Sequence, residues 1–493
     1  MSLRYSLVLG VVLSGLAAES GAQTLAELLP RLLSEAVTMP STVGNVAGNP
    51  HEAHFLPSAA QLVAPYALNG AIVSELSTFP TGSSSGGFTY TLEPPGFFPR
   101  RSSGNFGPAF AERALTIGKN RFSAGVNYQR VEFDSFQGLD LDDGDILFQL
   151  RHNECCPGQT PDGTPPTAPV PTVDANPSFE SDLVATTLFL EARTQTVSFF
   201  ANYGLTNQLD VSVAIPIVSV ELDATMESTL DRLGSGANTS IHTFAGVGGD
   251  PDHRISTESG SASGIGDILF RAKYNFWPQP GGGLALGLDL RLPTGDEDDL
   301  LGTGATQFKA SVYYSGDYGK FSPHVNLGYT FSSGGLSESL GTFALGDDVP
   351  TPTTGATDAY DTVFRGQDPG VVVPNLEVPD EFNYVVGFVA GVSPRLSLDF
   401  DLVGRWLQDV DRFELVPRDF PYRAVNGGPS LVATRQTVDL VERNSDVNLL
   451  IGVAGFKLNV AKTLLINAHV IFPLSDSGLS FKVAPVIGID YAF

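Results

Sequence analysis

The chain has few basic residues. Lys and Arg number 28 against 54 Asp and Glu, which gives a formal net charge of −26 over 493 residues. Nucleic-acid-binding proteins present basic stripes to the phosphates, so this balance excludes nucleic acid as a partner. An acidic excess is what long, solvated surface loops require for solubility.

Long apolar runs are also scarce, and mean hydropathy is +0.06. The one apolar run, Leu7 to Ala18, follows Arg4 and precedes small residues that end at Ala22. This pattern predicts a secretory signal peptide over residues 1–22. Without an apolar run long enough for a spanning helix, any membrane crossing must be made by strands that close on themselves.

The chain has 2 cysteines, the adjacent Cys155 and Cys156. After export they could form a disulfide that staples a loop. Two thiols with only His152 nearby are too few ligands for a metal site. We therefore predict neither a metal nor a cofactor.

Catalytic motifs are missing as well. The one G-x-S-x-G match, Gly82 to Gly86, lies in a Gly/Ser-rich turn stretch and not between a strand and a helix, and the sequence has no H-E-x-x-H and no phosphate-cradling loop. His324 and His469 are candidate bases, but neither has a recognisable Ser or Asp partner motif, so we predict no enzyme. The acidic stretches 140–145 and 293–299 could hold Ca²⁺, yet they lack EF-hand spacing and are interpreted as solvated loops.

The clearest pattern that is present lies at the carboxy terminus. Apolar residues occupy every second position there, and small or polar residues stand between them, with Val486 as the exception. A membrane-spanning strand needs about 9–11 residues with one apolar face. We interpret Tyr491 and the final Phe493 as an assembly signal for outer-membrane barrels; the alternative is the last strand of a secreted soluble β-domain. The apolar set is Phe481, Val483, Pro485, Ile487, Ile489, Tyr491 and Phe493.

Eleven similar segments precede this one, and short and long connections alternate between them. Bacterial barrels have short periplasmic turns and long external loops. We predict an all-β fold, a transmembrane antiparallel up-and-down β-barrel of about 12 strands over residues 119–493. Fourteen strands is the alternative if 114–117 and 145–150 also span. The predicted strands are 121–134, 183–204, 208–222, 264–277, 284–293, 306–317, 321–333, 381–392, 395–409, 445–458, 463–473 and 479–493. The predicted long loops are 135–182, 223–263, 334–380 and 410–444.

Residues 23–118 do not alternate. Leucines from Leu28 to Leu33 have helical spacing, but Pro30 lacks an N–H, so a short helix starting at Pro30 is expected. A second apolar patch, 62–76, is interrupted by a proline and a glycine. Turn-rich sequence follows, with aromatic residues that argue against disorder. We expect 23–118 to be an irregular, partly helical segment that plugs the barrel or lies in the periplasm.

Charged residues occupy the polar faces of the predicted strands. A lipid-facing Arg or Lys at mid-bilayer costs about 2–4 kcal/mol, so these side chains are expected to face the lumen. Two interpretations stay open: ion-pair ladders that brace the barrel, and residues that line a solute path. The channel-lining candidates are Arg271, Asp289, Arg291, His324, Asp399, Asp401, Arg405 and His469.

Four stretches together carry a family resemblance: 106–119, which begins FGPAFAER, then 202–211, 292–296 and 485–493. In this order they resemble bacterial outer-membrane transporters of the phenol-degradation (meta-pathway) family, which is related in style to fatty-acid and aromatic-hydrocarbon channels. The resemblance implies a channel for hydrophobic solutes in the cell outer membrane of a Gram-negative-type bacterium.

The sequence therefore predicts an outer-membrane channel for passive uptake of small hydrophobic or aromatic solutes. Its expected partners are outer-membrane lipid, the barrel-assembly machinery and a small-molecule solute. The alternatives are a general hydrophilic diffusion porin and a structural or adhesive surface barrel with a closed lumen.

Overall fold

The computed structural model describes residues 24–37, 39, 55–56, 59–78, 90–93, 98–101, 105–152, 182–234, 242–244, 249–336, 376–422, 433–461 and 463–492. The predicted signal peptide, the cysteine pair at 155–156 and Phe493 lie outside these residues.

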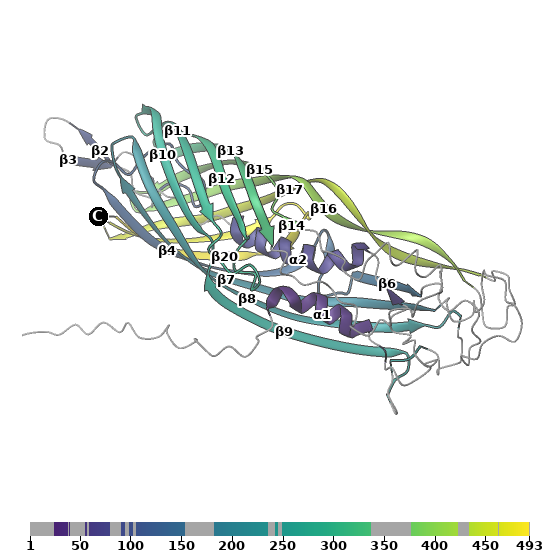
Figure 1. Cartoon of the computed structure of the whole chain (residues 1–493). Coiled ribbons are helices and arrows are strands. Elements are labelled where there is room, and N and C mark those ends of the chain that lie inside the picture. Colours follow the sequence, from purple (N-terminus) through teal and green to yellow (C-terminus); the bar gives the residue numbers. More distant parts are fainter. Residues whose placement is uncertain are drawn as a thin grey trace, which may run out of the picture.

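Twelve antiparallel strands close into a barrel, as the sequence predicts (Figure 1). Each strand pairs with the next, and the last returns to the first. In order around the barrel they are β4 (Phe122–Phe136), β7 (Leu183–Gly204), β8 (Leu209–Asp231), β10 (Ile268–Gln279), β11 (Gly282–Leu292), β12 (Ala305–Ser315), β13 (Phe321–Leu336), β15 (Glu381–Ser393), β16 (Leu396–Tyr422), β17 (Ala433–Ala461), β18 (Leu464–Pro473) and β20 (Ala484–Ala492).

The remaining strands lie outside this ring. β4 pairs with residues 192–203 of β7, and β6 (Ile146–His152) pairs with the preceding part of β7, residues 183–188. Residues 114–117 form no strand. The fourteen-strand alternative is therefore wrong. β2 and β3 form a separate hairpin near the carboxy-terminal end of the barrel (Figure 1). The other strands are β1 (Phe55–Leu56), β2 (Tyr90–Glu93), β3 (Phe98–Arg101), β5 (Leu139–Asp140), β9 (His253–Ile265), β14 (Leu376–Glu377) and β19 (Leu479–Phe481).

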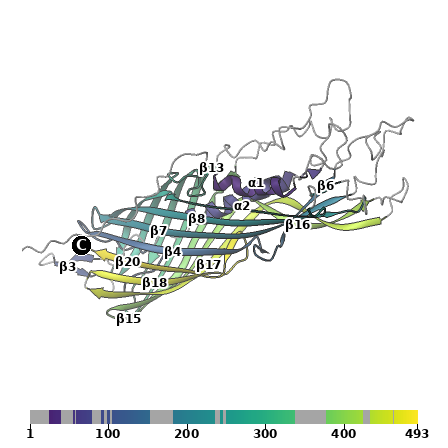
Figure 2. The same cartoon turned by 90° about the horizontal axis from the view of Figure 1, so that it is seen from below.

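Several strands continue far beyond the barrel as a one-sided shell (Figures 1 and 2). β8 runs on to Asp231 and pairs there with β9, while β16 and β17 pair as far as Tyr422 and Ala433. The predictions of loops over 223–263 and 410–444 are therefore wrong over these parts. We call this shell, formed by the distal parts of β6 to β9, β16 and β17, the strand extension.

β8 shows why the strand extension escaped the sequence pattern. Near its start Asp210 is buried and faces inward, while Ile215 and Ile217 face outward, Ile217 being 40% exposed. Further along, the faces exchange character: Val220 is inward and 0% exposed, and Glu221 is outward. Lipid surrounds the first part of β8 and water surrounds its continuation. The alternation with an apolar outer face, which predicts a spanning strand, therefore stops at the boundary between them.

The last strand follows the predicted alternation with one exception. Ile487 is 56% exposed and, with Ile489 and Tyr491, belongs to the apolar belt around the barrel. Phe481 was predicted to share this face, but it is 3% exposed. The strand is interrupted between β19 and β20, and β19 shifts register against β4, which turns Phe481 inward beside Phe133.

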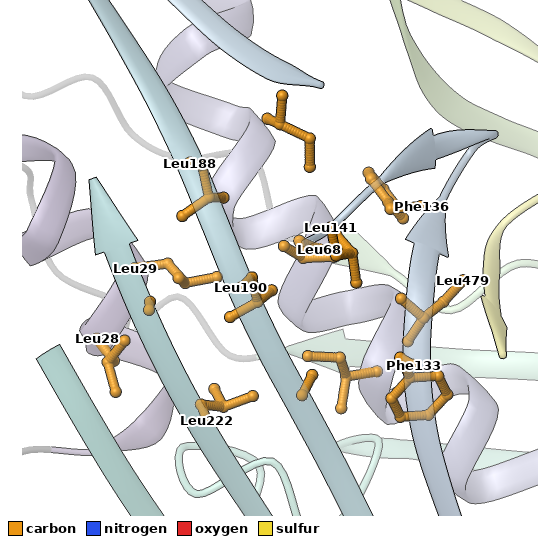
Figure 3. Close-up of a cluster of buried hydrophobic side chains, with 14 of the residues drawn as sticks. Leu28, Leu29, Leu68, Phe133, Phe136, Leu141, Leu188, Leu190, Leu222 and Leu479 are labelled. Atoms are coloured by element: carbon orange, nitrogen blue, oxygen red, sulfur yellow. The ribbon is translucent and has the colours of Figure 1, made fainter. Parts of the chain in front are cut away.

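Two helices fill the inner face of the strand extension: α1 (Leu25–Val37) and α2 (Ala59–Thr78) (Figure 1). Figure 3 shows Leu28 and Leu29 of α1 and Leu68 of α2 in one apolar core with Leu190 and Leu222. Neither described helix is long and apolar enough to cross a membrane. They are stabilised by burying apolar surface against the strands.

α1 begins earlier than the sequence predicts and continues through Pro30. Pro30 has no N–H for the carbonyl of Ala26 one turn earlier. The Nδ2 of Asn69 on α2 donates to that carbonyl instead, at 2.8 Å, and Asn69 is fully buried. At the start of α1 the N–H of Ala26 donates to the carbonyl oxygen of Asp298 at 2.9 Å, so the acidic loop caps this helix.

Asn69→Leu should destabilise the strand extension by about 1–3 kcal/mol, because it leaves the buried Ala26 carbonyl without a donor. Hydrogen exchange of the α1 and α2 amides measures this loss. The matched test adds Pro30→Ala, which restores a backbone donor. We expect Asn69→Leu to cost less in the Pro30→Ala background, and equal costs in both backgrounds would contradict the assignment.

Candidate functional site

The chain from Asn105 to Ile117 lies inside the barrel without forming a strand, and we call it the lumen segment. Its backbone cannot use a strand ladder, so its polar groups need other partners. The N–H of Glu112 donates to Asn326 Oδ1 at 2.7 Å, and that of Ile117 donates to Asp210 Oδ2 at 2.8 Å. Further bonds are Phe106 N–H to Ser397 Oγ, Ala114 N–H to Ser315 Oγ and Lys457 Nζ to the Pro108 carbonyl.

Glu112 of the lumen segment lies at the centre of an ion-pair network. Its Oε1 is 2.6 Å from Arg271 Nη1, and its Oε2 is 3.0 Å from Lys273 Nζ. Arg271 also donates two hydrogen bonds to Asp289, each 2.7 Å long. Such doubly bonded Arg–carboxylate pairs are strong and geometrically specific. The structure thus brings together the candidates Arg271 and Asp289, and adds Glu112, which the sequence analysis missed as a site residue.

Arg405, another candidate, connects the barrel wall to α2. Its Nε is 2.8 Å from Glu381 Oε2, and its Nη1 is 3.5 Å from Glu75 Oε1 of α2. Burial raises the pKa of the Glu75 carboxyl; the Arg405 guanidinium opposes this rise and the Glu381 carboxylate adds to it.

Each lumen histidine is paired with an aspartate. His324 Nε2 lies 2.6 Å from Asp401 Oδ1, and His469 Nε2 lies 3.1 Å from Asp399 Oδ2. The sequence shows no partner motif for either histidine, because the aspartates come from strands that are distant in the sequence. Among the described residues, no serine or threonine hydroxyl is hydrogen-bonded to either imidazole.

One cavity lies in the lumen, and a second adjoins it at the end of the barrel that meets the strand extension. The ionic chamber has a volume of about 120 Å³, and its walls include the candidates Arg271, Asp289, Arg291 and Arg405. The apolar cavity has a volume of about 620 Å³ and lies between α2 and the ends of the barrel strands. The Arg405–Glu75 ion pair separates them, since Arg405 lines the first and Glu75 the second. The apolar cavity is lined by Ala67, Ala71, Val73, Phe136, Val378, Leu407, Val410, Val447, Leu449 and Leu479, with polar residues between them.

Sequence reasoning missed three acids of this site. Glu112 lies in the stretch 106–113 that carries the family resemblance, so a signal for it was present. Glu381 is the first residue of the predicted strand 381–392, where the alternation does not show whether a side chain points to the lumen or to the outside. Glu75 had no signal, because only the packing of α2 places it beside Arg405.

Comparison with known proteins confirms the resemblance. The family model described as putative MetA-pathway of phenol degradation matches residues 171–358. No curated protein matches the chain by sequence.

Three solved structures are similar in part. An outer membrane channel from Pseudomonas putida F1 has 10% identity and a TM-score of 0.40, with 77% of this chain and 98% of that chain covered. A Pseudomonas aeruginosa FadL homologue has 11% identity and a TM-score of 0.31, covering 84% and 98%. The Ralstonia pickettii toluene transporter TbuX has 12% identity and a TM-score of 0.27, covering 79% and 94%.

The closed barrel and its apolar belt define the class of protein. Strands with lipid-facing apolar residues and a polar lumen are the signature of an outer-membrane β-barrel, so the chain resides in the outer membrane of a Gram-negative-type bacterium. Within that class it is similar to the phenol-degradation family over the matched residues.

Glu112→Gln should loosen the lumen segment. Breaking a buried ion pair from one side costs about 3–5 kcal/mol, and here two cations lose their shared carboxylate. Hydrogen exchange at the amides of Glu112, Ala114 and Ile117 should become faster. Glu132→Gln, at an exposed Arg130 pair, is the control and should leave these amides unchanged. Unchanged exchange in Glu112→Gln would show that the network does not hold the segment.

Proposed function

We propose that the protein is an outer-membrane channel for passive uptake of small hydrophobic or aromatic solutes. The apolar cavity is the observation that carries this proposal. Its volume of about 620 Å³ suits a small organic molecule. Of its 21 lining residues, 13 are apolar or glycine and eight are polar, and the polar ones include the acids Glu75, Asp380 and Asp409. The match to a phenol-degradation family model supports the same solute class.

The cavity would collect the solute by the hydrophobic effect. Burying apolar surface contributes about 25 cal/mol per Å², so even a single aromatic ring gains appreciable affinity there. The cavity is lined by α2 and by residues of β13, β16 and β17 where the barrel meets the strand extension. Solute would therefore enter from the side of the strand extension, which is the external side.

We further infer that residues 23–118 act as a plug. Support comes from the lumen segment, whose backbone is hydrogen-bonded to side chains of β8, β12, β13 and β16. A segment fixed to several walls disfavours an open, water-filled porin. Passage would then need the segment to shift, with the lumen ion pairs as the contacts that resist it.

The remaining partners follow from the outer surface. The apolar belt contacts outer-membrane lipid. We propose that Tyr491, which faces outward near the end of the last strand, forms with Phe493 the signal that the barrel-assembly machinery binds.

Ala71→Trp tests the cavity, because an indole at this position would occupy the space for solute. We expect the affinity for benzyl alcohol, measured by calorimetry on the full chain in detergent, to fall at least about tenfold, or about 1.4 kcal/mol. Thr225→Trp, on the outer face of the strand extension, is the control and should bind as the parent does. Equal affinities in all three proteins would place the solute site elsewhere.

A further inference from the structure

Among the channel-lining candidates predicted from the sequence, Arg291 alone forms no ion pair with another described residue. It lies on β11, two residues after Asp289 on the same inward face, and it lines the ionic chamber. Within the part of the chain that the structure describes, its guanidinium has no ion pair within 4 Å and no hydrogen bond, and the carboxylates of Asp267, Glu381 and Asp289 act on its charge only from a greater distance. Every other charged residue that lines the chamber has an ion-pair partner.

The charges around the chamber are unbalanced. Four cationic and three acidic side chains line it. Glu112 and Asp289 are both bonded to Arg271, and Glu381 is bonded to Arg405. Lys309 approaches an acid only loosely, at 3.9 Å from Asp289 Oδ2. The lining cations are Arg271, Arg291, Lys309 and Arg405, and the acids are Glu112, Asp289 and Glu381.

An unpaired cation inside a narrow chamber is costly unless an anion joins it. A guanidinium presents a planar pair of N–H donors that matches the two oxygens of a carboxylate. Lys309 Nζ adds a second, loosely held charge on the neighbouring strand β12, where Gln307 is the register partner of Arg291. The chamber is therefore suited to one small anion.

We propose that the ionic chamber binds a carboxylate, and that the transported solutes include amphipathic organic acids such as aromatic carboxylates. This inference rests on the proposed uptake function. The apolar cavity and the chamber are separated by the Arg405–Glu75 pair. An aromatic acid can thus be collected through its ring in the first and be bound through its carboxylate in the second.

The test compares benzoate with benzyl alcohol, which have a similar ring and differ in charge. Calorimetry on the detergent-solubilised full chain measures both affinities. In Arg291→Gln we expect the dissociation constant for benzoate to rise at least about tenfold, because a charge-assisted contact is lost, while that for benzyl alcohol stays unchanged. Arg291→Lys, which keeps the charge, should retain most of the benzoate affinity. Arg443→Gln, at an exposed pair on the strand extension, is the matched control.

The outcomes separate the two proposals. If the parent binds benzyl alcohol but Arg291→Gln binds benzoate as tightly as the parent does, the carboxylate site is wrong and the uptake function stands. If the parent binds neither compound, both proposals are wrong. If Arg291→Gln weakens both compounds equally, the residue acts through the shape of the lumen, and the carboxylate site is again wrong.

Discussion

The change from lipid to water along the strands is the constraint on which the rest of the structure depends. Where lipid surrounds the barrel, each strand must present apolar side chains outward, and its polar side chains therefore crowd into the lumen. Asp210, Lys273, Asp289 and Asp401 are all buried there. Charges at such density must find partners, and Arg271 with Asp289 and His324 with Asp401 are two such pairs. The lumen segment supplies Glu112 to Arg271 and Lys273, and its backbone forms hydrogen bonds with polar side chains of the barrel wall.

In the strand extension, beyond the lipid belt, the two faces of each strand exchange character. The outer faces of the extended strands meet water and become polar, so apolar residues such as Val220 and Leu222 turn inward. That inner apolar surface needs a cover, which α1 and α2 provide. The apolar cavity lies where the lipid-facing barrel meets the strand extension. It is lined on one side by α2, and the charged lumen adjoins it. A hydrophobic site and a charged chamber are thus adjacent as a consequence of the strand faces exchanging character.

Much of this fold could be predicted from the sequence, because alternation over a lipid-facing strand is a strong pattern. The twelve barrel strands, the outward Ile487 and the inward Asp399 all follow from it. The strand extension could not be predicted in this way, since its pattern inverts at the boundary. The continuation of α1 through Pro30 could not be predicted either, because the compensating donor, Asn69, comes from another helix. The pairing of His469 with Asp399, like the position of Glu75, depends on which strands and helices become neighbours.

Single-channel conductance of the refolded full chain in a planar bilayer, compared with Glu112→Gln, tests most directly the claim that the lumen segment closes the barrel. If ion pairs hold this segment in place, the full chain should be closed apart from rare, brief openings, and the variant should open more often and for longer. A steady open pore in the full chain, with the same conductance in the variant, would contradict the account.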